Sequence, residues 1–254
     1  MSIACNNLSV GHGPCAVLEG VNLQVEPGQA LCVLGPNGCG KSTLIKTLLG
    51  LLPPIAGQVL VNKKNLQTMP LKERARQLAY VPQNQGLAFN FNVHEVVLMG
   101  RTARWGLLHG PSKQDHAEVG LQLESLGIAN LQHRAFNELS GGQQQLVLIA
   151  RALYQGANCL VMDEPTANLD VANASLVLRT TLALCKHQGF GLVFSSHNPQ
   201  EALTHNTSVL LLKNRQVLAQ GQAHETLDAA HLSQLYGLPA QVHHVQAHPV
   251  VVWP

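Results

Sequence analysis

Residues 35–42 read Gly35-Pro36-Asn37-Gly38-Cys39-Gly40-Lys41-Ser42, and this stretch decides the fold. It satisfies the spacing G-x-x-x-x-G-K-[ST]. Glycines let the backbone wrap closely around phosphate oxygens, so that successive N–H groups point inward. Lys41 would place its charge on the outer phosphates, and the Ser42 hydroxyl could ligand Mg²⁺. We therefore expect residues 35–43 to bind nucleotide phosphates, with the helix that contains Thr43 adding the positive end of its dipole.

The segments beside this loop fit a strand, a turn and a helix in succession. Residues 30–34 form an apolar run that predicts a fully buried strand. Residues 41–49 predict a helix that Gly50 ends. Before them, apolar and polar residues alternate over 21–26, which is typical of a half-buried antiparallel strand. The loop is therefore expected at the end of a buried strand, where phosphate binding requires it.

Further along the chain, strands alternate with helices. We expect strands at 78–81, 159–162 and 191–195, a helix at 171–186 and a hairpin over 209–219. This alternation predicts a parallel sheet wrapped by helices. Between about residues 90 and 154 the signals are helical, and the patterns Ser112-x-x-Asp115 and Ser140-x-x-Gln143 are capping boxes that each open a helix. We expect this helical stretch to be an insertion into the sheet.

The composition excludes several classes of protein. The chain has 254 residues, 46% of them apolar, so it can bury a core. Its net charge of +2 gives too weak a field to indicate a nucleic-acid partner. The sequence contains no run of 18 apolar residues, so it predicts no membrane span. The cysteines are scattered without a C-x-x-C pair, which favours reduced thiols over a disulfide scaffold or a zinc ribbon.

Two carboxylates, Asp163 and Glu164, follow the apolar strand at 159–162. Taken alone, such a pair is usually a solvated turn. After a phosphate-binding loop, and at the carboxyl end of a neighbouring strand, Asp163 would reach the Mg²⁺ shell. Glu164, one residue further on, could polarise the attacking water. We therefore expect this pair to be part of a catalytic site.

The stretch Leu139-Ser140-Gly141-Gly142-Gln143 provides a second helix start suited to anions. Ser140 is expected to cap the helix, and the two glycines expose the first N–H groups. One such helix is enough for a simple nucleotide enzyme. A second one indicates that the nucleotide is held from two sides.

With these motifs in this order, the chain resembles the ATP-binding subunit of an ABC transporter over nearly its whole length. The resemblance implies an α/β fold: a P-loop NTPase (RecA-like) core with an antiparallel β subdomain and an inserted helical subdomain. It also implies ATP hydrolysis, with ATP and Mg²⁺ as cofactors. In that family the Leu139–Gln143 element is the signature motif, which acts on the ATP of the partner copy in a homodimer.

The same resemblance assigns roles to four further residues. Gln83 matches the Q-loop glutamine, which touches Mg²⁺ and water and relays to the membrane subunit. Asp170 matches the D-loop at the dimer seam, and His197 matches the switch histidine that contacts the γ-phosphate. Where the family usually stacks an aromatic side chain on adenine, this sequence has His12.

Three segments resemble the metal-chelate importers, which take up iron-siderophores, haem, vitamin B12, molybdate or other metals. They are residues 96–101, 136–139 and the tail from 235 onward. The resemblance implies an ATPase that powers uptake of a metal or metal chelate through separate membrane-spanning permease subunits, and indirectly an extracytoplasmic substrate-binding protein. The ATPase subunit would be a peripheral protein on the cytoplasmic face of the inner (cytoplasmic) membrane. Two alternatives remain open: a soluble ABC ATPase scaffold for iron–sulfur cluster assembly, and the ATPase subunit of an exporter.

The expected division of the chain follows from these segments. Residues 1–84 would be the first part of the nucleotide-binding core, and 85–154 the helical subdomain that carries the signature motif. Residues 155–236 would complete the core. Residues 237–254 would be a C-terminal tail, folded as a small hairpin on the core.

Two groups of reactive side chains allow more than one interpretation. Cys39 lies where a helix start could lower its thiol pKa and make it reactive, or it could be an inert small residue. His243, His244 and His248 lack cysteine or carboxylate neighbours at a recognised metal spacing, so we do not expect them to bind a metal.

Overall fold

The computed structural model describes residues 3–83, 90–104, 110–246 and 248–254. Its strands are β1 (Ile3–His12), β2 (Cys15–Val25), β3 (Ala30–Leu34), β4 (Ala56–Val61), β5 (Lys64–Asn65), β6 (Leu78–Val81), β7 (Cys159–Met162), β8 (Gly191–Ser196), β9 (Ser208–Lys213), β10 (Gln216–Gln222), β11 (Gln241–Val245) and β12 (His248–Val252). Its α-helices are α1 (Lys41–Leu48), α2 (Leu71–Gln77), α3 (Val93–Leu98), α4 (Lys113–Ser125), α5 (Gly141–Tyr154), α6 (Val171–Gln188), α7 (Pro199–His205), α8 (Ala223–Thr226) and α9 (Ala229–Tyr236). Short 3₁₀ helices lie at Leu66–Thr68, Met99–Arg104, Ala129–Leu131 and Phe136–Glu138.

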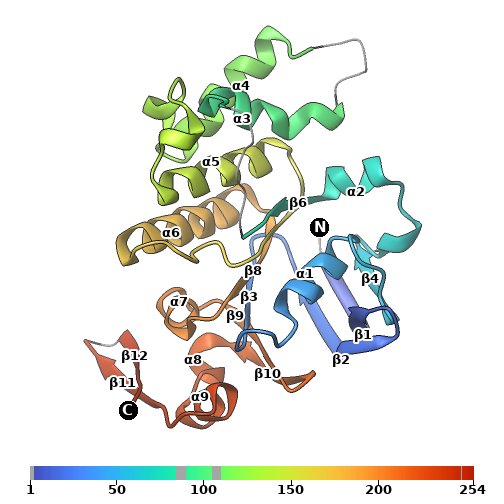
Figure 1. Ribbon diagram of the computed structural model, residues 1–254, viewed down its shortest axis with the longest axis vertical. Coiled ribbons are helices and arrows are strands. Elements are labelled where there is room, and N and C mark those ends of the chain that lie inside the picture. The colour runs from blue at the N-terminus through green and yellow to red at the C-terminus, as the bar shows by residue number, and fades with distance from the viewer. Residues whose placement is uncertain (1–2, 84–89, 105–109, 247) are drawn as a thin grey trace.

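The central sheet has the strand order β10-β9-β3-β8-β7-β6 (Figure 1). Neighbouring strands from β9 to β6 are parallel, and β10 pairs antiparallel with β9. Side chains of β3 alternate between two cores: Leu31 and Val33 join one, and Cys32 and Leu34 join the other. Burial on both faces explains why the parallel strands are continuous apolar runs in the sequence. The parallel sheet predicted from the sequence is confirmed.

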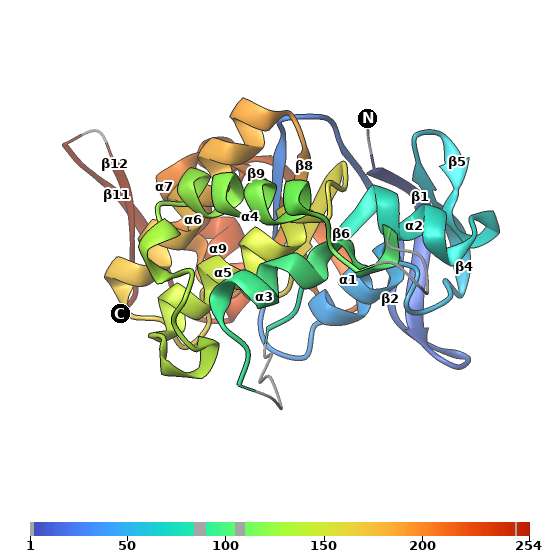
Figure 2. The same cartoon turned by 90° about the horizontal axis from the view of Figure 1, so that it is seen from above.

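Each face of the central sheet packs against a different layer. One core contains α1 and the antiparallel sheet β2-β1-β4-β5. The other contains helices from α3 to α7 and α9. Helices α3 to α5 gather at one end of the molecule, and the hairpin β11–β12 lies at the side opposite the antiparallel sheet (Figures 1 and 2). The expected α/β fold is confirmed. The subdomain boundaries stay predictions, and the one at 84/85 falls outside the described residues.

Local side-chain signals explain where the predicted helices begin. The Ser140 hydroxyl accepts from the Gln143 N–H at 3.4 Å, while the Ser140 N–H donates to Gln143 Oε1 at 3.1 Å. Ser112 and Asp115 form the same reciprocal pair at the start of α4. Asn92 and Glu95 form a further capping box before α3, which the sequence analysis did not identify. These caps satisfy backbone donors that the first helical turn leaves unpaired.

The C-terminal tail forms the expected hairpin and packs on α7. Gln200 makes two bonds to it: its Nε2 donates to the Pro249 carbonyl at 2.9 Å, and its Oε1 accepts from the Val251 N–H at 3.1 Å. Val242 and Val251 pack against the core that lies under the helices. Among the helices in the described ranges, none has both the length and the apolar character needed to cross a membrane.

Two histidines from different helices stack between α3 and α4. The rings of His94 and His116 are 5.1 Å apart at an angle of 7°, and His94 Nε2 lies 2.8 Å from His116 Nδ1. Partial burial lowers the pKa of His94, and the charges on His116 and His133 lower it further against an opposing effect of Glu95. The folded protein therefore resists protonation of this ring.

The unfolded chain binds a proton at His94 more readily, so the free energy of unfolding should fall as the pH drops through about 6.5. We expect the variant His94→Gln to show a weaker fall between pH 7.5 and 5.5 than the unchanged protein. Urea unfolding at both pH values measures this, with His12→Gln, at an exposed ring on β1, as the matched control. An equal fall in the His94→Gln variant and the unchanged protein would contradict the prediction.

Candidate functional site

The predicted phosphate loop lies between β3 and α1, and close packing requires its glycines. Gly40 has a φ of 106°, and a Cβ there would lie 2.8 Å from Val17 Cγ1 and 2.9 Å from Leu18 Cγ. A Cβ at Gly35 would lie 2.5 Å from the carbonyl oxygen of Leu212. The loop is thus held between β2 on one side and β9 on the other. Its shape is fixed by packing against the two sheets, as well as by the local sequence.

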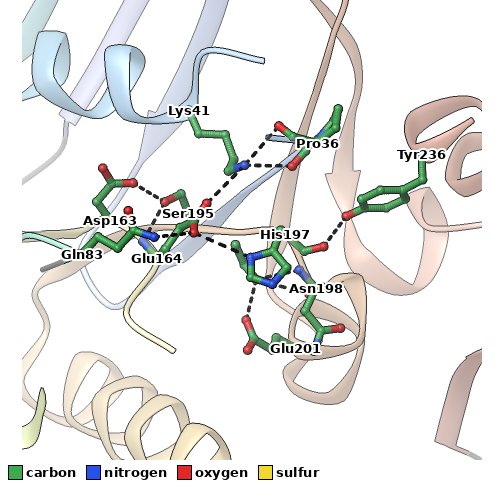
Figure 3. Close-up of polar contacts among 12 residues, drawn as sticks. Pro36, Lys41, Gln83, Asp163, Glu164, Ser195, His197, Asn198, Glu201 and Tyr236 are labelled. Carbon is green, nitrogen blue, oxygen red and sulfur yellow. Dashed lines mark hydrogen bonds and ion pairs between the residues drawn. The ribbon is translucent and has the colours of Figure 1, made fainter. Parts of the chain in front are cut away.

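Lys41, the first residue of α1, is buried at the centre of this loop. Its side chain is 5% exposed, and Nζ donates to the carbonyls of Gly35 at 2.9 Å and Pro36 at 3.3 Å (Figure 3). Nζ also lies 3.4 Å from Glu164 Oε1. The ammonium group is therefore held among oxygen atoms, and negatively charged phosphate oxygens would be stronger partners for it than the two carbonyls.

The two carboxylates after β7 are both fixed by Ser195 of β8. The Ser195 hydroxyl donates to Asp163 Oδ1 at 2.7 Å and accepts from the Glu164 N–H at 2.9 Å. Asp163 is 4% exposed, so this bond satisfies a buried charge. The sequence analysis placed Ser195 at the end of a strand without a role. One signal could have identified Ser195. It is a polar residue near the end of a buried parallel strand, and the neighbouring strand ends in carboxylates.

Glu164 is the point at which the predicted catalytic residues meet. Its Oε2 accepts from Gln83 Nε2 at 2.9 Å and lies 3.7 Å from His197 Nδ1 (Figure 3). Its backbone has a φ of 45°, a left-handed conformation that costs on the order of 1 kcal/mol for a residue with a Cβ. Its side chain is 14% exposed, whereas that of His197 is 58% exposed. The structure thus brings Gln83, Glu164, His197 and Lys41 together around one carboxylate.

The residues predicted to bind Mg²⁺ have suitable chemistry. Ser42, Gln83 and Asp163 offer a hydroxyl, an amide and a carboxylate, and Mg²⁺ prefers such hard oxygen donors. Gln83 donates to Glu164 through Nε2, so its Oε1 is the atom suited to a cation. Asp163 uses Oδ1 for Ser195, which makes Oδ2 the corresponding atom. This donor set fits a magnesium ion.

The signature element lies apart from the Glu164 cluster. Ser140 bonds to Gln143 and Gln144 of its own helix. A Cβ at Gly142 would lie 2.6 Å from Asn173 Cγ, so a glycine lets the first turns of α5 and α6 touch. Asn173 in turn donates through N and Nδ2 to the two oxygens of Asp170, each at 2.8 Å. These bonds lower the pKa of the Asp170 carboxyl and keep it charged.

His12 also lies outside the Glu164 cluster. It ends β1, is exposed, and pairs with Cys15 across the turn into β2. Because β2 contacts the phosphate loop at Val17 and Leu18, His12 is on the strand pair that borders the loop. Its position is compatible with a contact to a nucleotide base beyond the phosphates.

The interpretation of Cys39 as a thiol with a lowered pKa is wrong. Partial burial raises its pKa, and this effect exceeds the lowering by Lys41 and by the backbone N–H groups of the loop. A Cβ at Gly35 would lie 2.6 Å from Cys39 Sγ, so the thiol is packed against the loop backbone. The other interpretation, an inert small residue, agrees with this geometry.

Comparison with known proteins gives a consistent result. The family model described as ABC transporter matches residues 18–167. The chain is 39% identical to an uncharacterised ABC transporter ATP-binding protein of Haemophilus influenzae, over 96% of this chain and 92% of that protein. It is 36% identical to a hemin import ATP-binding protein of Bordetella avium, over 95% and 94%. A solved metal-chelate type ABC transporter in an inward-facing conformation covers 99% of this chain and 98% of its own, with 31% identity and a TM-score of 0.86.

We expect iodoacetamide at pH 7.5 to modify the exposed Cys15 well before Cys39, because the raised pKa leaves little thiolate at Cys39. Mass spectrometry of the digested protein after timed labelling measures the order. Labelling in guanidinium, where both thiols are exposed, is the control and should remove the difference. Modification of Cys39 ahead of Cys15 in the folded protein would disprove the prediction.

Proposed function

The chain belongs to the ABC transporter ATP-binding family, and on that premise we propose that it powers uptake of a metal or a metal chelate through a separate permease. Members of this family are ATPases that power transport, and its ATP-binding subunits act with membrane-embedded partners. The observation that supports turnover in this chain is the convergence of Lys41, Gln83 and His197 on Glu164. Support for the cargo class comes from the similarity to a hemin import protein and to a metal-chelate type transporter.

The alternatives left open by the sequence are not favoured. A scaffold for iron–sulfur assembly and an exporter ATPase would both keep the nucleotide site. The similarity to an import subunit, however, extends over 95% of the chain and is not confined to that site.

The proposed chemistry follows from the positions of the side chains. From its place in the loop, Lys41 binds the outer phosphates of ATP and neutralises part of their negative charge. Glu164 polarises the attacking water as general base, and Gln83 holds its carboxylate in place. His197, exposed at the edge of the cluster, contacts the γ-phosphate. When bound at Ser42, Gln83 and Asp163, Mg²⁺ supplies further charge neutralisation on the phosphates.

We infer that two copies of the chain close head to tail around two ATP molecules. Residues 140–143 start a helix whose first turn suits an anion, and the bonds between Ser140 and Gln143 stay within that helix. In a second copy these residues would face the ATP held by Lys41, with Asp170 at the seam and His12 beside the adenine. Closure would shift the helical part, and the region near Gln83 would pass this movement to the permease.

The remaining parts of the proposal concern location and organisation. The subunit would work on the cytoplasmic face of the inner membrane, and a substrate-binding protein outside that membrane would deliver the cargo to the permease. Residues 1–84 and 155–236 would form the nucleotide-binding core, 85–154 the helical part and 237–254 the tail.

Glu164→Gln should trap an ATP-bound dimer and lower the rate of phosphate release about 10²-fold or more, because the amide cannot act as a base. Phosphate release measures turnover, and gel filtration with ATP measures dimerisation. Glu225→Gln, at an exposed residue of α8, is the matched control and should change neither. Normal turnover in the Glu164→Gln variant would remove Glu164 from the role of base.

The transport function is tested by purifying the N-terminally tagged chain from a gentle detergent extract of its own cells. A hydrophobic partner with many membrane spans, in equal amount, is the expected companion. When this complex is placed in lipid vesicles, it should take up hemin or an iron(III) hydroxamate only when ATP is supplied. Soluble companions alone, from an extract shown to contain solubilised membrane proteins, would favour the scaffold ATPase instead.

A further inference from the structure

The backbone next to His197 is held by a residue from the last helix. The Tyr236 hydroxyl donates to the carbonyl oxygen of His197 at 2.9 Å (Figure 3). This carbonyl belongs to the peptide that joins His197 to Asn198, so the bond fixes the orientation of that peptide. Burial raises the pKa of the Tyr236 phenol, and the nearby Glu201 carboxylate raises it further, so the hydroxyl keeps its proton and remains a donor.

The Tyr236 ring is itself held by the C-terminal segment. Trp253 packs edge-on against it, with ring centroids 5.3 Å apart at an angle of 82°. Such T-shaped aromatic pairs are favourable beyond the area they bury. The hairpin that carries Trp253 is bonded to Gln200 of α7, the helix that follows His197 in the chain. The tail is therefore linked to the segment that follows His197 in two ways, through Tyr236 and directly at Gln200.

The rest of this segment is fixed by short-range bonds. Ser196 Oγ accepts from the Asn198 N–H at 2.9 Å and donates to Glu201 Oε2 at 2.6 Å. The imidazole of His197 is 58% exposed and lies 3.7 Å from Glu164, beyond an ordinary hydrogen bond. The direction of the imidazole is therefore set mainly by the backbone of His197. Tyr236 holds that backbone from outside residues 196–201.

We propose that Tyr236 is a positioning residue for ATP hydrolysis: its bond to the His197 carbonyl holds the imidazole on the Glu164 side, and Trp253 holds Tyr236. The proposal rests on the proposed role of His197. It makes the C-terminal hairpin part of the machinery that sets the turnover rate, although the hairpin's described bonds to the rest of the chain go to α7 and not to the phosphate loop.

Tyr236→Phe removes one hydroxyl and keeps the ring packed against Trp253. We expect kcat to fall about three- to tenfold, the range for loss of one hydrogen bond, with the KM for ATP unchanged within about twofold. Trp253→Leu should lower kcat in the same way. Because both variants act through one contact, the double variant should lose little beyond Tyr236→Phe alone.

Tyr154→Phe is the matched control. The Tyr154 hydroxyl also bonds to a backbone carbonyl, that of Asp115 at 3.1 Å, but within the helical part. This variant should keep the kcat of the unchanged protein. All rates are expressed per nucleotide-binding site, titrated with a fluorescent ATP analogue, so that a loss of folded protein does not count as a loss of turnover.

The outcomes separate this inference from the assignment of His197. An inactive His197→Ala variant together with normal kcat in Tyr236→Phe would overturn the positioning role and leave the role of His197 intact. Normal turnover in His197→Ala would overturn both. A loss of kcat in Tyr236→Phe that Tyr154→Phe reproduces, or that disappears when counted per binding site, would also overturn the positioning role.

Discussion

The buried hydroxyl of Ser195 is the contact on which the rest of the site depends. It joins the ends of β7 and β8 by bonding to Asp163 and to the Glu164 N–H. The parallel register pairs Met162 with Phe194, so the next residues of the two strands, Asp163 and Ser195, come side by side. A shift of this register by one residue would separate them and turn the carboxylates away from the loop. The apolar packing on both faces of the sheet holds the register and thereby the site.

Next to this hydroxyl, charge is balanced between a buried lysine and a partly buried glutamate. Lys41 and Glu164 are 5% and 14% exposed, and each compensates the other at 3.4 Å. A pair with this little exposure is costly to split because the remaining charge loses its partner. The phosphates of a nucleotide offer Lys41 a second partner of the same sign as Glu164. In the proposed mechanism, Lys41 would release Glu164 when the phosphates are in place, so the carboxylate would not act before ATP has bound.

Short motifs could be predicted from the sequence, and contacts across the sheet could not. The phosphate loop, the caps at Ser112 and Ser140 and the hairpin over 209–219 each depend on residues a few positions apart. Ser195 and Tyr236 act on residues more than 30 positions away, so strand order and helix packing decide their roles. The choice between the two interpretations of Cys39 could not be made from the sequence for the same reason: the helix start is visible there, whereas burial is a property of the folded chain. Helix α2 and the strands β4 and β5 are short and lack a clear period, and the sequence analysis did not identify them.

The contact between Gly142 and Asn173 joins two parts of the chain that would meet a second copy. Gly142 leaves no space between the first turns of α5 and α6, and Asn173 ties α6 to the carboxylate of Asp170. Sliding the two helix starts past each other would break this packing, which couples them into a single unit. In a symmetric pair of chains, that unit would contact one ATP through Ser140 and the opposite chain through Asp170. ATP bound at one site would then affect the other site through this packed unit, and the two sites would act together.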